Sequence, residues 1–222
     1  MEPLSPDIQV VIYDLDGVLV DSLDANVAYY NRLLQHFGMP PVRPEHLEII
    51  QTRTSREVIE QLFPDADLAA AARAFEKQMD NEGIIPLIRL QPHVRQTLAA
   101  LRRSCRTAIA SNRGKSLPLV LAHHRLAAFF DLTVSSAQVQ SPKPHPDYLQ
   151  IILATFALTP RQALYVGDAD VDAQLAAAVG VPFVAYNNPK LPALAHISDH
   201  REILALLPAC GRCCQPGDSR SA

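Results

Sequence analysis

The feature that most constrains the fold is a short apolar run that stops at two carboxylates. Val10–Tyr13 is an unbroken apolar segment, typical of a strand that is buried on both faces of a parallel sheet. Asp14 and Asp16 follow two residues apart, so their side chains point the same way on an extended chain. Gly17 lets the backbone turn away directly after them. Because ligands of open α/β sheets bind at the carboxyl ends of the strands, the acidic pair is predicted to line a binding site.

The same residues also have a plainer interpretation, in which a strand runs into an Asp-Gly turn. Two carboxylates crowded at a strand end are unfavourable unless a proton or a cation is held there. Asp-x-Asp-Gly followed by Asp21 and Ser22 is also far more specific than a turn alone. We therefore favour a functional site.

Helical and strand patterns fall into two blocks along the chain. Helices are expected after a Ser22 N-cap, at the Thr54-x-x-Glu57 capping box and near Asp67, all before a second core strand. Pro92 is expected to open the next helix, after which strands and helices alternate. Alternation predicts a doubly wound, parallel α/β sheet. The later strands are predicted at 107–111, 132–135, 163–167 and 182–186.

These patterns predict a catalytic α/β core, a helical insert and a tail. The core comprises residues 1–17 and 89–207, and residues 18–88 form the inserted helical cap domain. Residues 208–222 are rich in Gly, Ser, Arg and Cys without periodicity, which is typical of a loosely held tail. Within it, Cys210, Cys213 and Cys214 are candidate zinc ligands, but they lack a partner set that completes four ligands.

Charge and hydropathy narrow the classes of partner. The formal net charge is −3, with 20 basic and 23 acidic residues spread along the chain, which argues against nucleic acid. No apolar run approaches the roughly 18 residues of a membrane span, and the N-terminus lacks the pattern of a secretory signal. We expect a cytoplasmic protein, either a monomer or a homodimer.

Polar groups follow several other predicted strands. The second strand ends at Ser111 and Asn112, the third leads to Lys143 between two prolines, and the fourth is followed by Asp168 and Asp172. Hard oxygen ligands suit Mg²⁺, and the hydroxyl, amide and ammonium groups suit a phosphate. Each has a simpler alternative: Lys143 as an exposed lysine, Ser111 as a strand-terminal hydroxyl, and Asp168 and Asp172 as caps of the following helix.

In this order, the four segments resemble the motifs of the haloacid dehalogenase superfamily, over Val10 to about Tyr186. The resemblance implies a phosphotransferase in which Asp14 is the nucleophile that becomes an aspartyl phosphate. Asp16 would protonate the leaving alcohol and then take a proton from water. The implied Mg²⁺ ligands are Asp14, the main-chain carbonyl of Asp16 and Asp168, with Asp172 acting through water or steadying the loop. Ser111, the Asn112 N–H and Lys143 would bind the phosphoryl oxygens.

The chain departs from the family pattern at two places. Ala169 stands where a small hydroxyl residue usually follows the first Asp of the fourth motif, which removes a hydrogen bond but no metal ligand. Pro92-His93 stands where a glycine commonly follows the proline, at the return from the insert to the core.

Asp16 and Asn26 bear on which reaction is catalysed. Relatives with dehalogenase or carbon–phosphorus cleavage activity usually lack the second Asp, so Asp16 argues against both. Sugar phosphomutases retain it but carry a cap histidine where Asn26 stands, and a mutase cap lysine is replaced near Gln78. Hydrolysis is therefore favoured over the phosphomutase alternative. A non-enzymatic phospho-accepting or ligand-binding module is a second alternative, although receiver domains lack a helical insert and an acid at the Asp16 position.

A cap that closes over the site and excludes water implies a small phosphorylated metabolite. The resemblance is greatest to phosphoglycolate phosphatase-like enzymes, which favours a small phosphorylated acid or sugar. Arg56, with Arg53 nearby, is the best candidate for gripping a carboxylate or second phosphate, and Asn26 is a further substrate candidate. A solvated arginine at a helix end is the alternative for Arg56.

Overall fold

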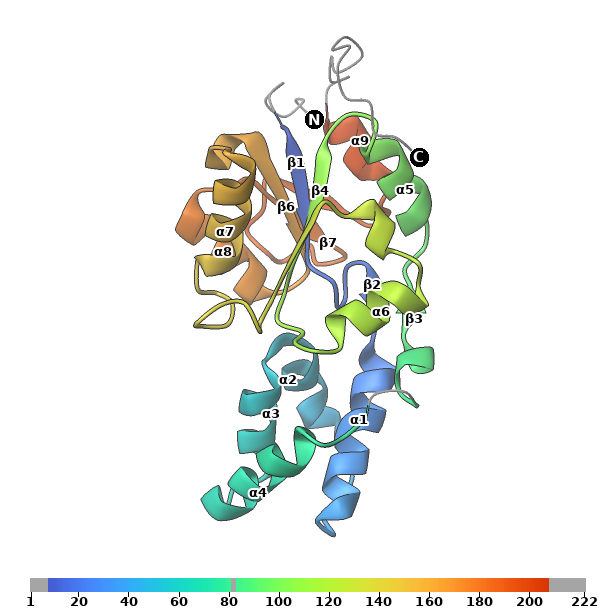
Figure 1. The fold of residues 1–222 in the computed structure, drawn as a ribbon, viewed down its shortest axis with the longest axis vertical. Coiled ribbons are helices and arrows are strands. Elements are labelled where there is room, and N and C mark those ends of the chain that lie inside the picture. Colours follow the sequence, from blue (N-terminus) through green and yellow to red (C-terminus); the bar gives the residue numbers. More distant parts are fainter. Residues whose placement is uncertain (1–7, 81–82, 208–222) are drawn as a thin grey trace.

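A six-stranded parallel sheet forms the centre of the molecule in the computed structural model, which describes residues 8–80 and 83–207 (Figure 1). Its strand order is β5-β4-β1-β6-β7-β8, so the acidic pair follows a central strand. This confirms the predicted α/β class. The strands are β1 (Val10–Tyr13), β4 (Arg106–Ser111), β5 (Leu132–Ser135), β6 (Ala163–Gly167), β7 (Phe183–Tyr186) and β8 (Ala195–Ile197).

Helices cover both faces of this sheet, and β1 contributes to both packing layers. Val11 and Tyr13 pack in one hydrophobic cluster, whereas Val10 and Ile12 pack in the other, as expected for a strand whose side chains alternate. All four are fully buried. The first face carries α5 (Val94–Leu101), α6 (Leu117–His123) and α9 (Glu202–Leu206), and the second carries α7 (Asp147–Phe156) and α8 (Asp170–Val179).

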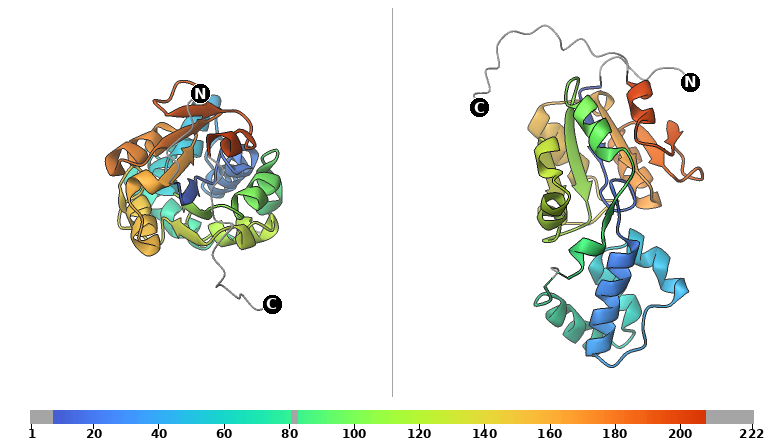
Figure 2. Two further views of the ribbon diagram at one scale, coloured as in Figure 1. Left: turned by 90° about the horizontal axis from the view of Figure 1, so that it is seen from above. Right: turned by 90° about the vertical axis from the view of Figure 1, so that its right-hand side faces the viewer.

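Four α-helices between β1 and α5 form a separate layer beyond the carboxyl ends of the strands (Figure 2). They have their own hydrophobic cluster, in which Leu33, Ile59, Phe63 and Ala72 are almost fully buried. The Thr54 capping box is confirmed, since the Glu57 N–H and the Thr54 hydroxyl oxygen lie 3.4 Å apart. The helices are α1 (Leu23–His36), α2 (Leu47–Thr52), α3 (Ser55–Leu62) and α4 (Ala66–Glu76).

The two connections to this helical layer lie side by side. β2 (Val20–Asp21) pairs antiparallel with β3 (Arg89–Leu90), and the Gln91 N–H donates to the Leu19 carbonyl at 3.0 Å. The chain therefore leaves the core and returns to it through one short ribbon. Single-turn 3₁₀ helices complete the connections at Pro44–His46, Ile85–Leu87, Ala127–Phe129 and Pro160–Gln162.

Several local expectations were wrong or incomplete. Ser22 occupies the N-cap position of α1 without a capping hydrogen bond from its side chain. Pro92 lies in a turn, and α5 begins after His93, whose φ of 61° lies in the left-handed region where glycine is favoured. Helices α2 and α9 and strand β8 are short additions that the sequence patterns did not reveal. Cys210, Cys213, Cys214 and the proposed tail lie outside the described residues.

Within the described residues, no helix combines the length and apolar character that crossing a membrane requires.

Shortening a buried side chain of the central strand β1 should show how much that strand's packing contributes to the stability of the fold. We expect Ile12→Ala to lower the free energy of unfolding by about 2–5 kcal/mol, because Ile12 is fully buried in the second cluster. Leu119→Ala is the matched control, since this side chain is 48% exposed and its loss should change stability by about 0.5 kcal/mol or less. Urea denaturation of both variants measures the difference, and equal losses would contradict the packing argument.

Candidate active site

Asp14 stands directly after β1, where neighbouring strands fix its backbone. Its N–H donates to the Val166 carbonyl of β6 at 2.9 Å, and the residue is only 9% exposed. Gly17 begins the turn that follows, with a φ of 80°. A Cβ at Gly17 would lie 1.9 Å from Asp168 Oδ2, so the turn and the fourth motif can approach this closely only with glycine there.

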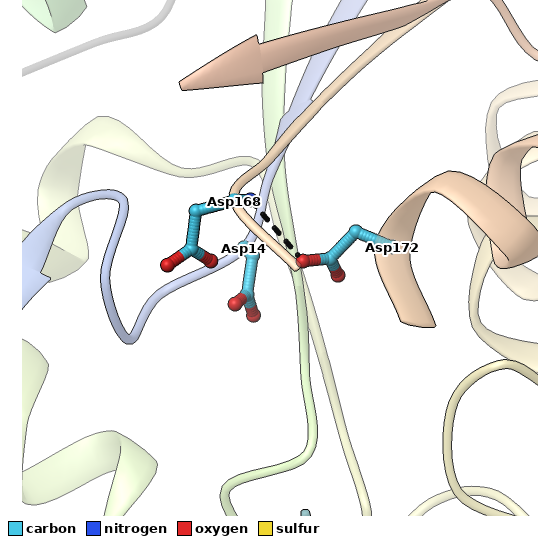
Figure 3. A group of neighbouring side chains, drawn as sticks. All are labelled: Asp14, Asp168 and Asp172. Carbon is cyan, nitrogen blue, oxygen red and sulfur yellow. Dashed lines mark hydrogen bonds between the residues drawn. The ribbon is translucent and has the colours of Figure 1, made fainter. Parts of the chain in front are cut away.

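Three carboxylates converge at this end of the sheet. Asp14, Asp168 and Asp172 each offer an oxygen, and these oxygens lie within 4.8 Å of one another (Figure 3). Asp14 comes from the end of β1, Asp168 from the end of β6 and Asp172 from the first turn of α8. Hard oxygen ligands at this spacing suit Mg²⁺.

The electrostatics of the cluster fit a divalent cation as well. Burial raises the pKa of Asp14 to about 7, and the nearby Asp172 carboxylate adds to the rise while Lys143 opposes it. Burial, followed by repulsion from Asp14 and Asp172, also raises the pKa of Asp168 well above its usual value. A bound cation would offset this repulsion and stabilise the ionised forms.

Lys143 supplies a buried positive charge between two of these acids. Its Nζ donates to Asp14 Oδ1 at 2.7 Å and to Asp172 Oδ1 at 2.9 Å, and the residue is 5% exposed. Burial alone would lower the pKa of Lys143, but the two carboxylates outweigh it and hold the pKa above its usual value. The interpretation of Lys143 as a solvated lysine is therefore wrong.

Asp172 orders the loop that carries Asp168. Its Oδ1 also accepts a hydrogen bond from the Tyr165 hydroxyl at 2.6 Å. Its Oδ2 lies 3.3 Å from the Asp168 N–H and 3.2 Å from the Ala169 N–H, at the start of α8. The Asn188 side chain, which the motif analysis missed, donates to the Asp168 carbonyl at 2.8 Å. The sequence did offer a signal for Asn188. Asn187 and Asn188 directly follow the strand β7, and polar groups also follow the other central strands, where they border the site.

Ser111 and Asn112 lie beside the acids at the end of β4. The Ser111 hydroxyl oxygen accepts from the Arg113 N–H at 3.1 Å, and Ser111 is almost fully buried. Asn112 Oδ1 accepts hydrogen bonds from the main-chain N–H of Lys143 at 3.0 Å and from the Tyr148 hydroxyl at 2.9 Å. The Asn112 side chain thus ties the Lys143 loop to the end of β4.

Asp16 is paired with Arg113, a residue that the motif analysis did not single out. Arg113 Nη2 lies 2.6 Å from Asp16 Oδ1, and Nε lies 2.9 Å from Oδ2. Burial would raise the pKa of Asp16, but the Arg113 guanidinium, together with the Ser22 hydroxyl and the Lys143 charge, outweighs it, and the pKa lies below its usual value. The signal for Arg113 in the sequence was its place directly after Ser111-Asn112, in a loop already expected to border the site.

A cavity of about 380 Å³ lies between these groups and the helical layer. Its wall includes Arg56, Asn26 and the loop 52–55, so both substrate candidates reach it. Arg56 pairs with Glu60 at 3.0 Å, and its side chain is 77% exposed, which places it at the solvent side. Asn26 lies deeper, where its Oδ1 is 3.3 Å from Arg113 Nη2.

Comparison with known proteins finds relatives of one family. The family model described as "Haloacid dehalogenase-like hydrolase" matches residues 11–186. A phosphoglycolate phosphatase of Pseudomonas putida is 31% identical over 221 residues, covering 91% of this chain and 79% of the relative. That of Escherichia coli is 30% identical over 209 residues, covering 80% and 81% respectively.

A solved structure gives the same result for the fold. The crystal structure of a HAD-superfamily hydrolase of subfamily IA from Geobacter sulfurreducens is 36% identical, with a TM-score of 0.77. The match covers 94% of this chain and all of that one. The family match over residues 11–186 contains Asp14, Lys143 and Asp168 at the strand ends, and the chain therefore belongs to the haloacid dehalogenase-like hydrolases.

Proposed function

We propose that this protein is a Mg²⁺-dependent phosphatase that hydrolyses a small phosphate monoester through an aspartyl phosphate on Asp14. The observation that carries this proposal is the buried contact of 2.7 Å between Asp14 Oδ1 and Lys143 Nζ, within reach of two further carboxylates. The names of the relatives described above support the choice of a phosphate ester as substrate.

A cation is required because the nucleophile and the substrate are both anions. The Asp14 and Asp168 carboxylates and the Asp16 main-chain carbonyl would hold Mg²⁺, while Asp172 orders the loop. When bound, Mg²⁺ supplies positive charge that reduces the repulsion between carboxylate and phosphate. Lys143 adds a positive charge on the other side of Asp14, which would help to stabilise the charge on the phosphoryl oxygens.

Asp14 and Asp16 would divide the covalent and proton-transfer steps. An Asp14 oxygen attacks phosphorus and the bond to the ester oxygen breaks, while Asp16 gives a proton to the leaving alcohol. Water then attacks phosphorus, Asp16 takes its proton, and the Asp14 carboxylate is regenerated as free phosphate leaves. Ser111 and the Asn112 N–H would bind phosphoryl oxygens beside Lys143.

The helical layer would act as a cap. We propose domain boundaries at 18–88 for the cap and at 1–17 and 89–207 for the core. The paired connections β2 and β3 support this division, because a short two-stranded ribbon can act as a hinge. A cavity between core and cap favours a small substrate, such as 2-phosphoglycolate, and Arg56 at its mouth would attract a second anionic group.

The environment of Asn26 supports hydrolysis over phosphoryl return to a second hydroxyl. An amide does not titrate near neutral pH and cannot act as a general acid or base, unlike the cap histidine of the mutases that the sequence resembles. The Asn26 amide oxygen also accepts a hydrogen bond from Arg113, so in this arrangement the Asn26 side chain makes a structural contact.

Metal binding should depend on Asp168 and barely on the Asp16 side chain. We expect Asp168→Asn to weaken Mg²⁺ binding by at least about tenfold, and Asp16→Asn to leave it nearly unchanged, because Asp16 contributes its main-chain carbonyl. Isothermal titration calorimetry measures both, with Asp24→Asn at an exposed ion pair as control. EDTA should abolish turnover and added Mg²⁺ should restore it. Equal weakening by the Asp16 and Asp168 variants would contradict the assigned ligands.

The covalent step predicts a trapped phosphoenzyme. Acid quenching during turnover of small phosphate esters, followed by peptide mass spectrometry, should place phosphate on Asp14. Asp14→Asn should lack both the adduct and turnover, because an amide is a poor nucleophile. The phosphate esters tested should include 2-phosphoglycolate and glucose 1-phosphate. Glucose 1-phosphate should give no isomeric sugar phosphate. Turnover by Asp14→Asn at the wild-type rate, or isomer formation, would refute the proposal.

Proton transfer by Asp16 predicts a dependence on the leaving group. We expect Asp16→Asn to lower kcat by about 10²–10⁴-fold with an alkyl phosphate, whose alcohol leaves poorly without a proton. The loss should be smaller with p-nitrophenyl phosphate, because p-nitrophenolate leaves readily as an anion. Steady-state kinetics with both esters measures the difference, and equal losses would argue against the acid role.

A further inference from the structure

Arg113 is built into the site more firmly than a surface arginine would be. It stands in the loop after β4, and its Nε and Nη2 donate to both oxygens of the Asp16 carboxylate. The two side chains are only 13% and 19% exposed. A bidentate pair of this kind fixes the carboxylate in position and orientation, which a single contact or a lysine would not do.

The other donors of Arg113 reach two further elements. Nη2 also lies 3.3 Å from Asn26 Oδ1 on α1, and Nη1 lies 3.3 Å from the hydroxyl oxygen of Ser116, just before α6. Asn26 in turn lies 3.3 Å from the hydroxyl oxygen of Ser22 through its Nδ2. The guanidinium therefore joins the Asp16 loop to the first helix of the insert and to the core.

These contacts distinguish Arg113 from three of the other cations that line the cavity. Arg53, Lys77 and Lys115 also line it, and their side chains have no hydrogen bond or ion pair with any of residues 8–80 and 83–207. Those cations are free to meet a substrate anion. In contrast, Nε, Nη1 and Nη2 of Arg113 each already donate to an oxygen atom of the protein.

We propose that Arg113 is a positioning residue for Asp16, and that through Asn26 it makes the position of the Asp16 carboxylate depend on helix α1. The inference rests on the proposed function, in which Asp16 transfers protons. Proton transfer requires the carboxylate within hydrogen-bond reach of the substrate oxygen, so a displacement of about 1 Å is enough to slow it greatly.

Substitution of Arg113 tests this role through the separate kinetic constants. We expect Arg113→Gln to lower kcat by up to about 10²-fold with little change in KM, because the reactive geometry is lost while substrate contacts remain. Arg113→Lys should recover only part of kcat, since an ammonium cannot make the bidentate contact. Arg95→Gln is the matched control: this arginine donates to the His124 carbonyl away from the site and should keep wild-type kinetics.

A double-mutant cycle shows whether Arg113 acts through Asp16. With p-nitrophenyl phosphate, Arg113→Gln should cause little further loss in an Asp16→Asn background, because the group that it positions is already absent. Asn26→Ala should lower kcat less than Arg113→Gln does, and it should add nothing to Arg113→Gln. Asn31→Ala is the control for α1 and should leave kcat unchanged. Asn31 lies on the same helix, and its side-chain oxygen accepts a hydrogen bond from the Val42 N–H.

The other outcomes are decisive as well. A raised KM with unchanged kcat, or an undiminished effect in the Asp16→Asn background, would mean that Arg113 binds substrate and would overturn the inference. Wild-type kcat in Arg113→Gln, or a loss that only follows the unfolded fraction in thermal melts, would also overturn it. Wild-type kinetics in Asp16→Asn would instead remove the proton-transfer role in the proposed function, and the two failures are therefore distinguishable.

Discussion

The site depends on keeping several carboxylates close together away from water. Asp14, Asp168 and Asp172 repel one another, and burial makes the anions of Asp14 and Asp168 less stable. Lys143 offers one buried positive charge, which does not balance three acids. The cluster is therefore stable as a set of anions only with additional positive charge, and this requirement is the physical basis for proposing a divalent cation. Neighbouring features serve the same arrangement: Gly17 leaves room for Asp168, and Tyr165 donates to Asp172.

The sheet and the core of the site followed from local sequence because both depend on short patterns. Val10–Tyr13 is apolar throughout and is buried on both faces, and the acids after it stand at a position fixed by strand geometry. Lys143 was accessible to the same reasoning, because parallel strands bring their carboxyl ends to one edge. Neither inference needed knowledge of contacts between distant side chains.

What the sequence left unresolved depends on such contacts. Arg113 in sequence is a polar residue in a loop, and only the fold brings it to Asp16, 97 positions away. The ribbon of β2 and β3 has two residues in each strand, too few for a detectable period. His93 adopts a backbone conformation that favours glycine, and no local pattern predicts that from a histidine. The role of Asp172 in ordering its loop was similarly one of several alternatives until its partners were known.

The two acids of the first motif differ in their environments, and this difference bears on the proposed cycle. Burial raises the pKa of Asp14, whereas at Asp16 the effect of burial is more than offset by Arg113 together with Ser22 and Lys143, and the pKa is lowered. Arg113 thus favours the ionised Asp16, which is the form that accepts a proton when water attacks the phosphoenzyme. The same guanidinium opposes protonation of Asp16 before the alcohol leaves. In the proposed cycle Arg113 therefore orients Asp16 in both half-reactions, but its charge assists the second and opposes the first.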